Sequence, residues 1–149
     1  MCSHRMREIS LRCETCIKEK GAILMAIQVV TTEQSTLFTI RTKHTTYQMK
    51  ADEYGVLLHL WYGASVEGDM SYLLDYPDVG FSGNLYEAEN RRTYSLNTLP
   101  LEYATEGVGD FRIPAVAATH ADGSNALDLR YQSYSIHKGK YAIAGLPAV

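Results

Sequence analysis

Residues 56–63, Val-Leu-Leu-His-Leu-Trp-Tyr-Gly, form the stretch that decides the fold. The run is nearly all apolar and ends at Gly63, a pattern typical of a strand with both faces covered. The preceding Asp52-Glu53-Tyr54-Gly55 predicts a turn, because Gly55 can adopt a positive φ at no steric cost. This segment therefore predicts a central strand of a layered β structure.

Strand patterns also flank this stretch. Residues 37–42 and 45–50 mix apolar and β-branched side chains, with a short turn expected at 43–44. Further along, regular structure is expected at 113–119, a tight turn at Asp122-Gly123, strands at 126–131 and 133–137, and a turn at 138–140. No segment combines helix caps with a period of 3.6 residues. The sequence predicts an all-β, sandwich-like domain.

Residues 64–110 differ from the rest because they show no clear periodicity. Proline and glycine recur among isolated aromatic residues. An ordered loop of this length is uncommon in a compact domain and is usually functional or packed on a partner. We therefore expect this segment to be functional or packed on a partner.

Length and charge exclude several classes of protein. The 149 residues suit one domain, and a (β/α)₈ barrel, typically about 250 residues, does not fit. No run approaches 18 apolar residues, so no membrane span is expected. The formal net charge of -3 gives no electrostatic case for binding nucleic acid or an anionic membrane surface.

The first 24 residues read as a different kind of sequence. They hold all three cysteines, Cys2, Cys13 and Cys16, and carry a net charge of +2, whereas residues 25–149 carry -5 and all the aromatic residues. One interpretation is a zinc or redox site, since Cys13-x-x-Cys16 with Cys2 and His4 supplies four ligands. A second is a signal peptide with residues 21–30 as its apolar core, although no small-residue cleavage site follows.

We favour a third interpretation, in which residues 1–24 are a non-native leader or a disordered extension. Lys20-Gly21-Ala22 can be encoded by codons that contain a ribosome-binding sequence, at a normal initiation distance from the codon for Met25. Native protein would then begin at Met25 and contain no cysteine. The apolar end of the chain at Val149 indicates a partial domain that spans residues 25–149.

Residue chemistry alone points to no enzyme class. The sequence has no G-x-S-x-G, P-loop or H-E-x-x-H motif, and His44, His59, His120 and His137 lack metal-ligand spacing. His59 is expected to be a satisfied core or interface residue. Two groups of loop residues stay open between structural and sugar-binding roles: tyrosines that stack or pack, and carboxylates that form turns or bind hydroxyls. They are Tyr72, Tyr76, Tyr86, Asp69, Asp75, Asp78 and Asp110.

Seven segments from Met25 onward, in order, resemble the N-terminal domain of bacterial α-galactosidases of glycoside hydrolase family 36. They cover about 110 residues and correspond to the family patterns LxTKNTSY, HLYYG, GFSGNPYE, YSLDTLPQEYP, GDFRxPA, DLRY and GLPA. Here they are residues 40–47, 58–63, 80–87, 94–103, 109–115, 127–131 and 145–148. The departures are Leu85 and Ala104 in place of Pro, Asn97 in place of Asp, and residues 120–123 in place of an ENG-like turn.

The resemblance implies a large β-sandwich, or supersandwich, that precedes a (β/α)₈ catalytic barrel. It implies a parent enzyme that hydrolyses terminal α-galactose from melibiose and raffinose-type sugars with retention. Retaining hydrolysis needs two carboxyl groups about 5 Å apart. In the family both are barrel aspartates, one in a KWD-type motif that is missing here, so this chain is expected to be inactive alone.

The resemblance also implies one substrate-binding residue. In tetrameric members, an aspartate before the FSxN segment, commonly in D-R-G/A-F, reaches a neighbouring subunit's active site and bonds galactose hydroxyls. The same offset gives Asp78-Val79-Gly80-Phe81, so Asp78 is the match and Asp75 the second candidate. We expect an α-galactoside substrate, a homotetrameric parent enzyme, a cytoplasmic location, and no cofactor or metal.

Two other classes of function remain open at this point. One is a stand-alone carbohydrate-binding or assembly module of sandwich fold, which would have no catalytic barrel. The other is a zinc-binding regulator that uses Cys2, Cys13 and Cys16.

Overall fold

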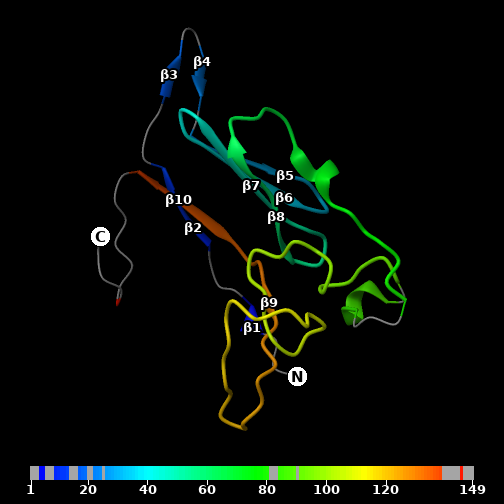
Figure 1. The fold of residues 1–149 in the computed structure, drawn as a ribbon. Coiled ribbons are helices and arrows are strands. Elements are labelled where there is room, and N and C mark those ends of the chain that lie inside the picture. The colour runs from blue at the N-terminus through cyan, green and yellow to red at the C-terminus, as the bar shows by residue number, and fades with distance from the viewer. Residues whose placement is uncertain are drawn as a thin grey trace.

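The fold is known from a computed structural model, shown as a ribbon in Figure 1. It describes residues 4–5, 9–13, 17–19, 22–24, 26–80, 84–89, 91–138 and 145. Cys2, Cys16, the segment 81–83, the predicted turn at 139–140 and the apolar end at 146–149 lie outside these residues.

The centre of the fold is a four-stranded antiparallel sheet in the order β5-β6-β7-β8. The strands are Ile27–Thr31, Thr36–Arg41, Thr45–Ala51 and Leu57–Ala64. β6, β7 and β8 lie within two residues of the predicted strands, which confirms those predictions. A register shift between Gln48 and Met49 marks a β-bulge in the pairing of β7 with β8.

Both faces of this sheet are covered, as the apolar run in β8 predicts. Because side chains alternate along a strand, Leu57 and Leu58 lie in two different clusters. Leu57 belongs to a cluster with Phe38 and Met49. Leu58 is fully buried in a second cluster, built mainly from residues of the long loop. The buried loop members of that cluster are Leu85, Ala88, Tyr94, Leu96 and Leu99.

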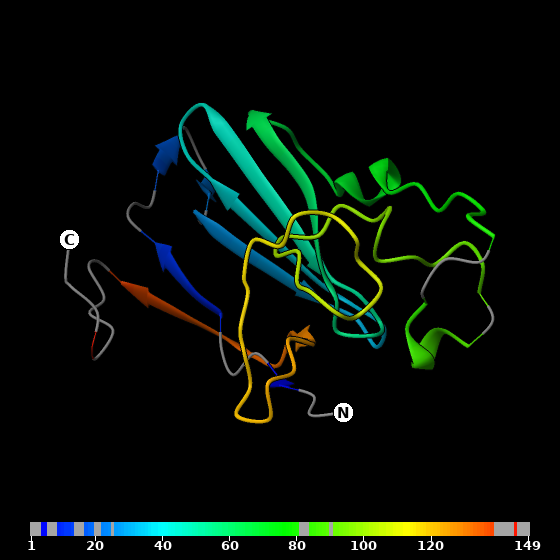
Figure 2. The same cartoon turned by 60° about the horizontal axis from the view of Figure 1, so that its bottom comes forward.

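Short strands complete the all-β fold. β1 (His4–Arg5) pairs in parallel with β9 (Leu129–Arg130), and β2 (Ile9–Cys13) with β10 (Tyr134–Lys138). β3 (Ile17–Glu19) and β4 (Ala22–Leu24) form a hairpin. Figure 2 shows β2 and β10 as a separate ribbon beside the main sheet. The prediction that residues 1–24 are a non-native leader concerns where translation starts. The fold does not test it, and it stays a prediction.

The C-terminal part brings aromatic residues onto the main sheet. The rings of Tyr131 and Tyr134 contact Phe38 edge to face, at 5.7 and 5.4 Å between ring centroids. Edge-to-face packing is a favourable aromatic geometry, which ties the segment around β9 and β10 to β6.

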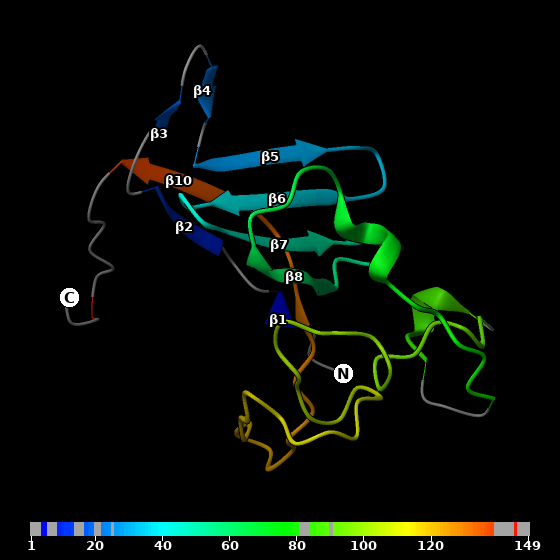
Figure 3. The same cartoon turned by 45° about the horizontal axis from the view of Figure 1, so that its top comes forward.

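The long segment after β8 extends to one side of the sheet (Figure 3). It contains two short 3₁₀ helices, η1 (Met70–Leu73) and η2 (Tyr86–Ala88). Its end returns to the edge of β8, where Leu101 pairs with Leu58 and the His59 N–H donates to the Pro100 carbonyl at 2.7 Å. The segment is therefore the layer that covers one face of the sheet.

Two predictions about the later strands are corrected. Residues 113–119 form no strand and contribute one bridge, between Val116 and Thr105, while Ile113 is exposed. Asp122-Gly123 does form a turn, in which the Gly123 N–H donates to the His120 carbonyl, but no strands flank it. The predicted strand at 126–131 is reduced to β9.

No helix among the described residues is long and apolar enough to cross a bilayer.

Candidate functional site

The loop that carries the candidate aspartates is anchored where it leaves β8. The buried amide of Gln48 accepts a hydrogen bond from the Met70 N–H and donates one to the Gly68 carbonyl. The Asp69 carboxylate accepts from the Ser71 N–H at 2.7 Å and caps η1. Asp69 is thus a turn-forming residue, one of the two roles its position in the loop allowed.

A second anchor holds the loop between η1 and η2. The ring of Tyr76 stacks on Tyr94, which is buried, with ring centroids 6.5 Å apart. The Tyr94 hydroxyl donates to the carboxylate of Asp52 at 2.6 Å. Burial raises the pKa of Asp52, although that hydroxyl and the N–H groups of Tyr54 and Val56 oppose the shift.

A small hollow of about 150 Å³ lies between this anchor and the end of β7. The charged residues that line it already have protein partners: Lys50 donates to Ser71, Arg91 pairs with Glu53 at 2.7 Å, and Asp52 accepts from Tyr94. Because these groups have protein partners, the hollow is best explained as a gap between the loop and the sheet.

Asp78 occupies the exposed tip of the loop. Its Oδ1 accepts two hydrogen bonds, each 3.0 Å long, from the Gly80 N–H and from Nε of Arg92, and it forms an ion pair with Nη2 of Arg92 at 3.0 Å. The side chain keeps 55% of its surface exposed. Asp75 is also exposed, and it forms no hydrogen bond or ion pair with another residue in the described part of the chain.

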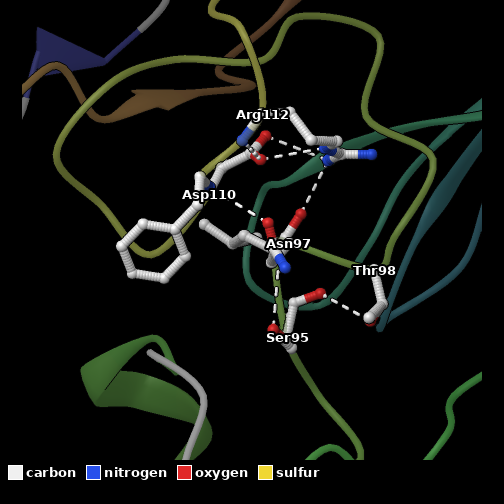
Figure 4. A network of polar contacts seen from close by, with 7 residues as sticks. Ser95, Asn97, Thr98, Asp110 and Arg112 are labelled. Carbon is white, nitrogen blue, oxygen red and sulfur yellow. Dashed lines mark hydrogen bonds and ion pairs between the residues drawn. The ribbon is translucent and has the colours of Figure 1, made fainter.

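Asp110 has the opposite environment, shown in Figure 4. Its side chain is fully buried and accepts from the N–H, Nε and Nη2 of Arg112. Burial favours the neutral acid, but the Arg112 hydrogen bonds outweigh it, so the pKa of Asp110 lies below its usual value. Arg112 also donates to the Leu96 carbonyl, and the Phe111 N–H donates to Asn97. Asp110 is therefore structural.

The three candidate tyrosines also separate. Tyr76 packs on Tyr94, whereas Tyr72 and Tyr86 are strongly exposed. The role of Tyr76 is therefore to pack the loop. The rings of Tyr72 and Tyr86 are accessible for stacking on a ligand.

His59 has the satisfied role that the sequence favours. Its Nδ1 lies 3.0 Å from a carboxylate oxygen of Glu102, whose other oxygen accepts from the Tyr47 hydroxyl. In the described part of the chain, no three His, Cys, Asp or Glu side chains gather as a metal site would require. Cys2 and Cys16, two of the proposed zinc ligands, lie outside those residues.

A family model described as the glycosyl hydrolase family 36 N-terminal domain matches residues 55–149. The chain belongs to this family. The resemblance read from the seven segments is thereby confirmed, and the all-β fold agrees with it.

Curated relatives of this family 36 domain are α-galactosidases. The bifunctional α-galactosidase/sucrose kinase AgaSK of Mediterraneibacter gnavus is 50% identical over 113 residues, which are 76% of this chain and 12% of the relative. Alpha-galactosidase 1 of Pediococcus pentosaceus is 39% identical over 126 residues, which are 82% of this chain and 17% of the relative. The domain thus spans less than a fifth of the length of these relatives.

Solved structures agree with the fold. The galactosidase domain of AgaSK superposes with a TM-score of 0.72 at 46% identity, covering 82% of this chain and 17% of that one. The α-galactosidase AgaA of Geobacillus stearothermophilus, in complex with raffinose, gives 0.66 at 36% identity, covering 75% and 16%.

Sequence reasoning missed Arg92, the partner of Asp78 in this family 36 domain. The two residues are fourteen positions apart in a segment without periodicity, so no local pattern joins them. The one available signal was the Arg91-Arg92 pair, the only adjacent basic residues between 64 and 110.

Proposed function

We propose that this domain is the N-terminal, non-catalytic part of a retaining α-galactosidase that acts on melibiose and raffinose-type sugars. The similarity to α-galactosidases supports this proposal, as does the structure of a relative in complex with raffinose. The two catalytic carboxyl groups would lie in the part of the enzyme outside these 149 residues.

We further propose that Asp78 binds galactose hydroxyls in the active site of a neighbouring subunit of a homotetramer. One observation supports this proposal. The Asp78 carboxylate is exposed, and hydrogen bonds from Gly80 and Arg92 hold one of its oxygens while the other stays open. An ionised carboxylate accepts hydroxyl hydrogen bonds, and charge-assisted bonds are the stronger kind. Asp110 is excluded from this role because its carboxylate is fully buried against Arg112, and Asp69 is assigned instead to capping η1.

The experiment is a chimera in which this chain replaces the matched segment of AgaSK, assayed with an α-galactoside. Asp78→Ala should raise KM about tenfold or more, since each hydrogen bond to a charged group contributes roughly 1.5–3 kcal/mol. The kcat should change little, because the bond is made in both ground and transition states. The tetramer should persist by light scattering.

Asp75→Ala is the matched control, since it removes a second exposed carboxylate from the same loop and should leave KM unchanged. An unchanged KM in Asp78→Ala would remove Asp78 from the site, and a raised KM in Asp75→Ala alone would transfer the role there. An inactive parent chimera would contradict the proposal that this domain serves such an enzyme.

The reading frame beyond the codon for Val149 tests the wider proposal directly. A frame that continues into a barrel with a KWD-type motif supports an α-galactosidase. A stop codon at that point would favour the alternative, a stand-alone carbohydrate-binding or assembly module.

A further inference from the structure

Arg92 contacts the Asp78 turn in two ways, through its side chain and through its backbone. The guanidinium donates from Nε to Oδ1 of Asp78, and its Nη2 forms an ion pair with the same oxygen. The backbone carbonyl of Arg92 accepts from the Val79 N–H at 3.2 Å. One residue thus fixes both the side chain of Asp78 and the backbone that follows it.

We propose that Arg92 is the positioning residue for Asp78, and that it leaves Oδ2 as the oxygen that accepts hydroxyl groups of the galactoside. The inference rests on the proposed role of Asp78 and adds the residue and the atom. A carboxylate oxygen offers about two lone pairs. Oδ1 already accepts two hydrogen bonds, from the Gly80 N–H and Arg92 Nε, whereas Oδ2 has no hydrogen bond to another described residue.

The turn itself is built for this arrangement. Gly80 has a φ of +67°, where other residues are strained, and its N–H donates to Oδ1. An added Cβ would meet nothing closer than Arg92 Nη2 at 3.9 Å, so the backbone angle rather than space requires glycine. The Gly80 N–H and the Arg92 guanidinium together set the direction in which the free oxygen points.

The exposure of the pair argues against a mainly stabilising role. Asp78 and Arg92 keep 55% and 65% of their side-chain surfaces in solvent. Exposed ion pairs contribute little to stability. An arginine that donates a hydrogen bond to one oxygen of an exposed carboxylate and pairs with it is better explained by orientation, which matters when the other oxygen has to meet a ligand.

Arg91 provides a matched control within the same chain. It is adjacent and similarly exposed, but its guanidinium donates to Glu53 and to the Tyr54 hydroxyl instead of Asp78. A nonspecific effect of losing one positive charge from this loop would appear in Arg91→Gln as well as in Arg92→Gln.

The test uses the active chimera with this chain in place of the matched AgaSK segment. Arg92→Gln should raise KM for an α-galactoside about threefold to tenfold with kcat nearly unchanged. Arg92→Lys, which keeps the charge but loses the planar guanidinium that donates from Nε, should fall between wild type and Arg92→Gln. Arg91→Gln should match wild type. Asp78→Ala combined with Arg92→Gln should be no worse than Asp78→Ala alone, because a positioning residue has nothing left to position.

Each contrary result separates this inference from the proposed function. If Asp78→Ala raises KM and Arg92→Gln does not, the inference is overturned and Asp78 keeps its role. If Arg92→Gln raises KM further in the Asp78→Ala background, Arg92 acts on its own and is no positioning residue. If Asp78→Ala has no effect, the proposed site itself fails. A fall of more than about 3 °C in the Tm of the 149-residue chain with Arg92→Gln would assign Arg92 to folding instead.

Discussion

Replacing Asp110 with alanine is expected to destabilise the 149-residue chain by about 2–3 kcal/mol. The carboxylate is fully buried and accepts three hydrogen bonds of 2.9–3.0 Å from Arg112. Removing one partner of a fully buried ion pair costs about 3–5 kcal/mol. The expected loss is smaller because the Arg112 side chain is 40% exposed, so water can reach its guanidinium, which also keeps its bond to the Leu96 carbonyl.

Urea unfolding followed by the fluorescence of Trp61 measures this loss. With a slope of about 2–3 kcal/mol/M, the midpoint should fall by about 1 M. Asp78→Ala is the control, because its ion pair is exposed and should contribute less than about 1 kcal/mol. Equal losses for the two variants would refute the argument that burial makes the Asp110 network stabilising.

The pKa of Asp110 adds a second criterion. Because it is lower in the folded state than its usual value of 3.8, the folded chain releases this proton more readily than the unfolded chain. The Asp110 stabilisation is therefore present above about pH 4 and is lost as the pH falls through the folded-state pKa. The stability difference between wild type and Asp110→Ala should shrink below pH 4, and a constant difference would contradict the assignment.

Three further predictions concern the core, the backbone and the tyrosines. Phe38→Ala should cost about 3–5 kcal/mol in urea unfolding, because the ring is fully buried, and a loss below about 1 kcal/mol would contradict its place in the core. Gly107→Ala should lower Tm by several degrees more than Gly68→Ala. Both have a positive φ, but only at Gly107 would the new Cβ meet another backbone, 2.7 Å from the Cα of residue 126, so equal shifts would count against this geometry. Burial raises the pKa of Tyr47 and Tyr94, and neighbouring carboxylates add to this shift. Absorbance titration should therefore show these two phenols ionising above pH 10 in the folded chain. The free energy of unfolding should fall as the pH rises past 10, because the unfolded chain loses these protons first. Ionisation of all eleven tyrosines together near pH 10 would exclude this.

The sequence predicts best those strands whose pattern lies within the strand itself and the turns at its ends. β6, β7 and β8 combine alternating apolar residues with turn residues at their ends, and the structure places them within two residues of the prediction. Residues 113–119 are also largely apolar, but they contain Pro114 and three alanines and form no strand. Strand propensity depends on packing against neighbouring strands, and in the described chain this segment contributes a single bridge.

The covering layer was not predictable because its order comes from contacts far apart in the sequence. Tyr94 reaches Asp52, and Gln48 holds the backbone around Met70, over separations of 42 and 22 residues. The apolar residues of the layer contact the sheet individually, without the regular spacing of a helix or a strand. The sequence of this segment therefore shows no period. The irregular pattern predicts a long loop that is functional or packed on a partner, and the structure adds that the same loop supplies most of one of the two core clusters.

The four candidate aspartates of the loop show how the structure reduces the number of candidate binding residues. In the sequence they look alike, as acidic residues among glycines and prolines. In the structure, Asp69 caps a 3₁₀ helix, and the buried carboxylate of Asp110 is held by Arg112, so both have a role in the fold. Asp75 has no partner among the described residues and no fixed direction. Asp78 is held by two residues, Gly80 and Arg92, with one oxygen engaged and the other available, and this combination suits the binding of an uncharged sugar hydroxyl.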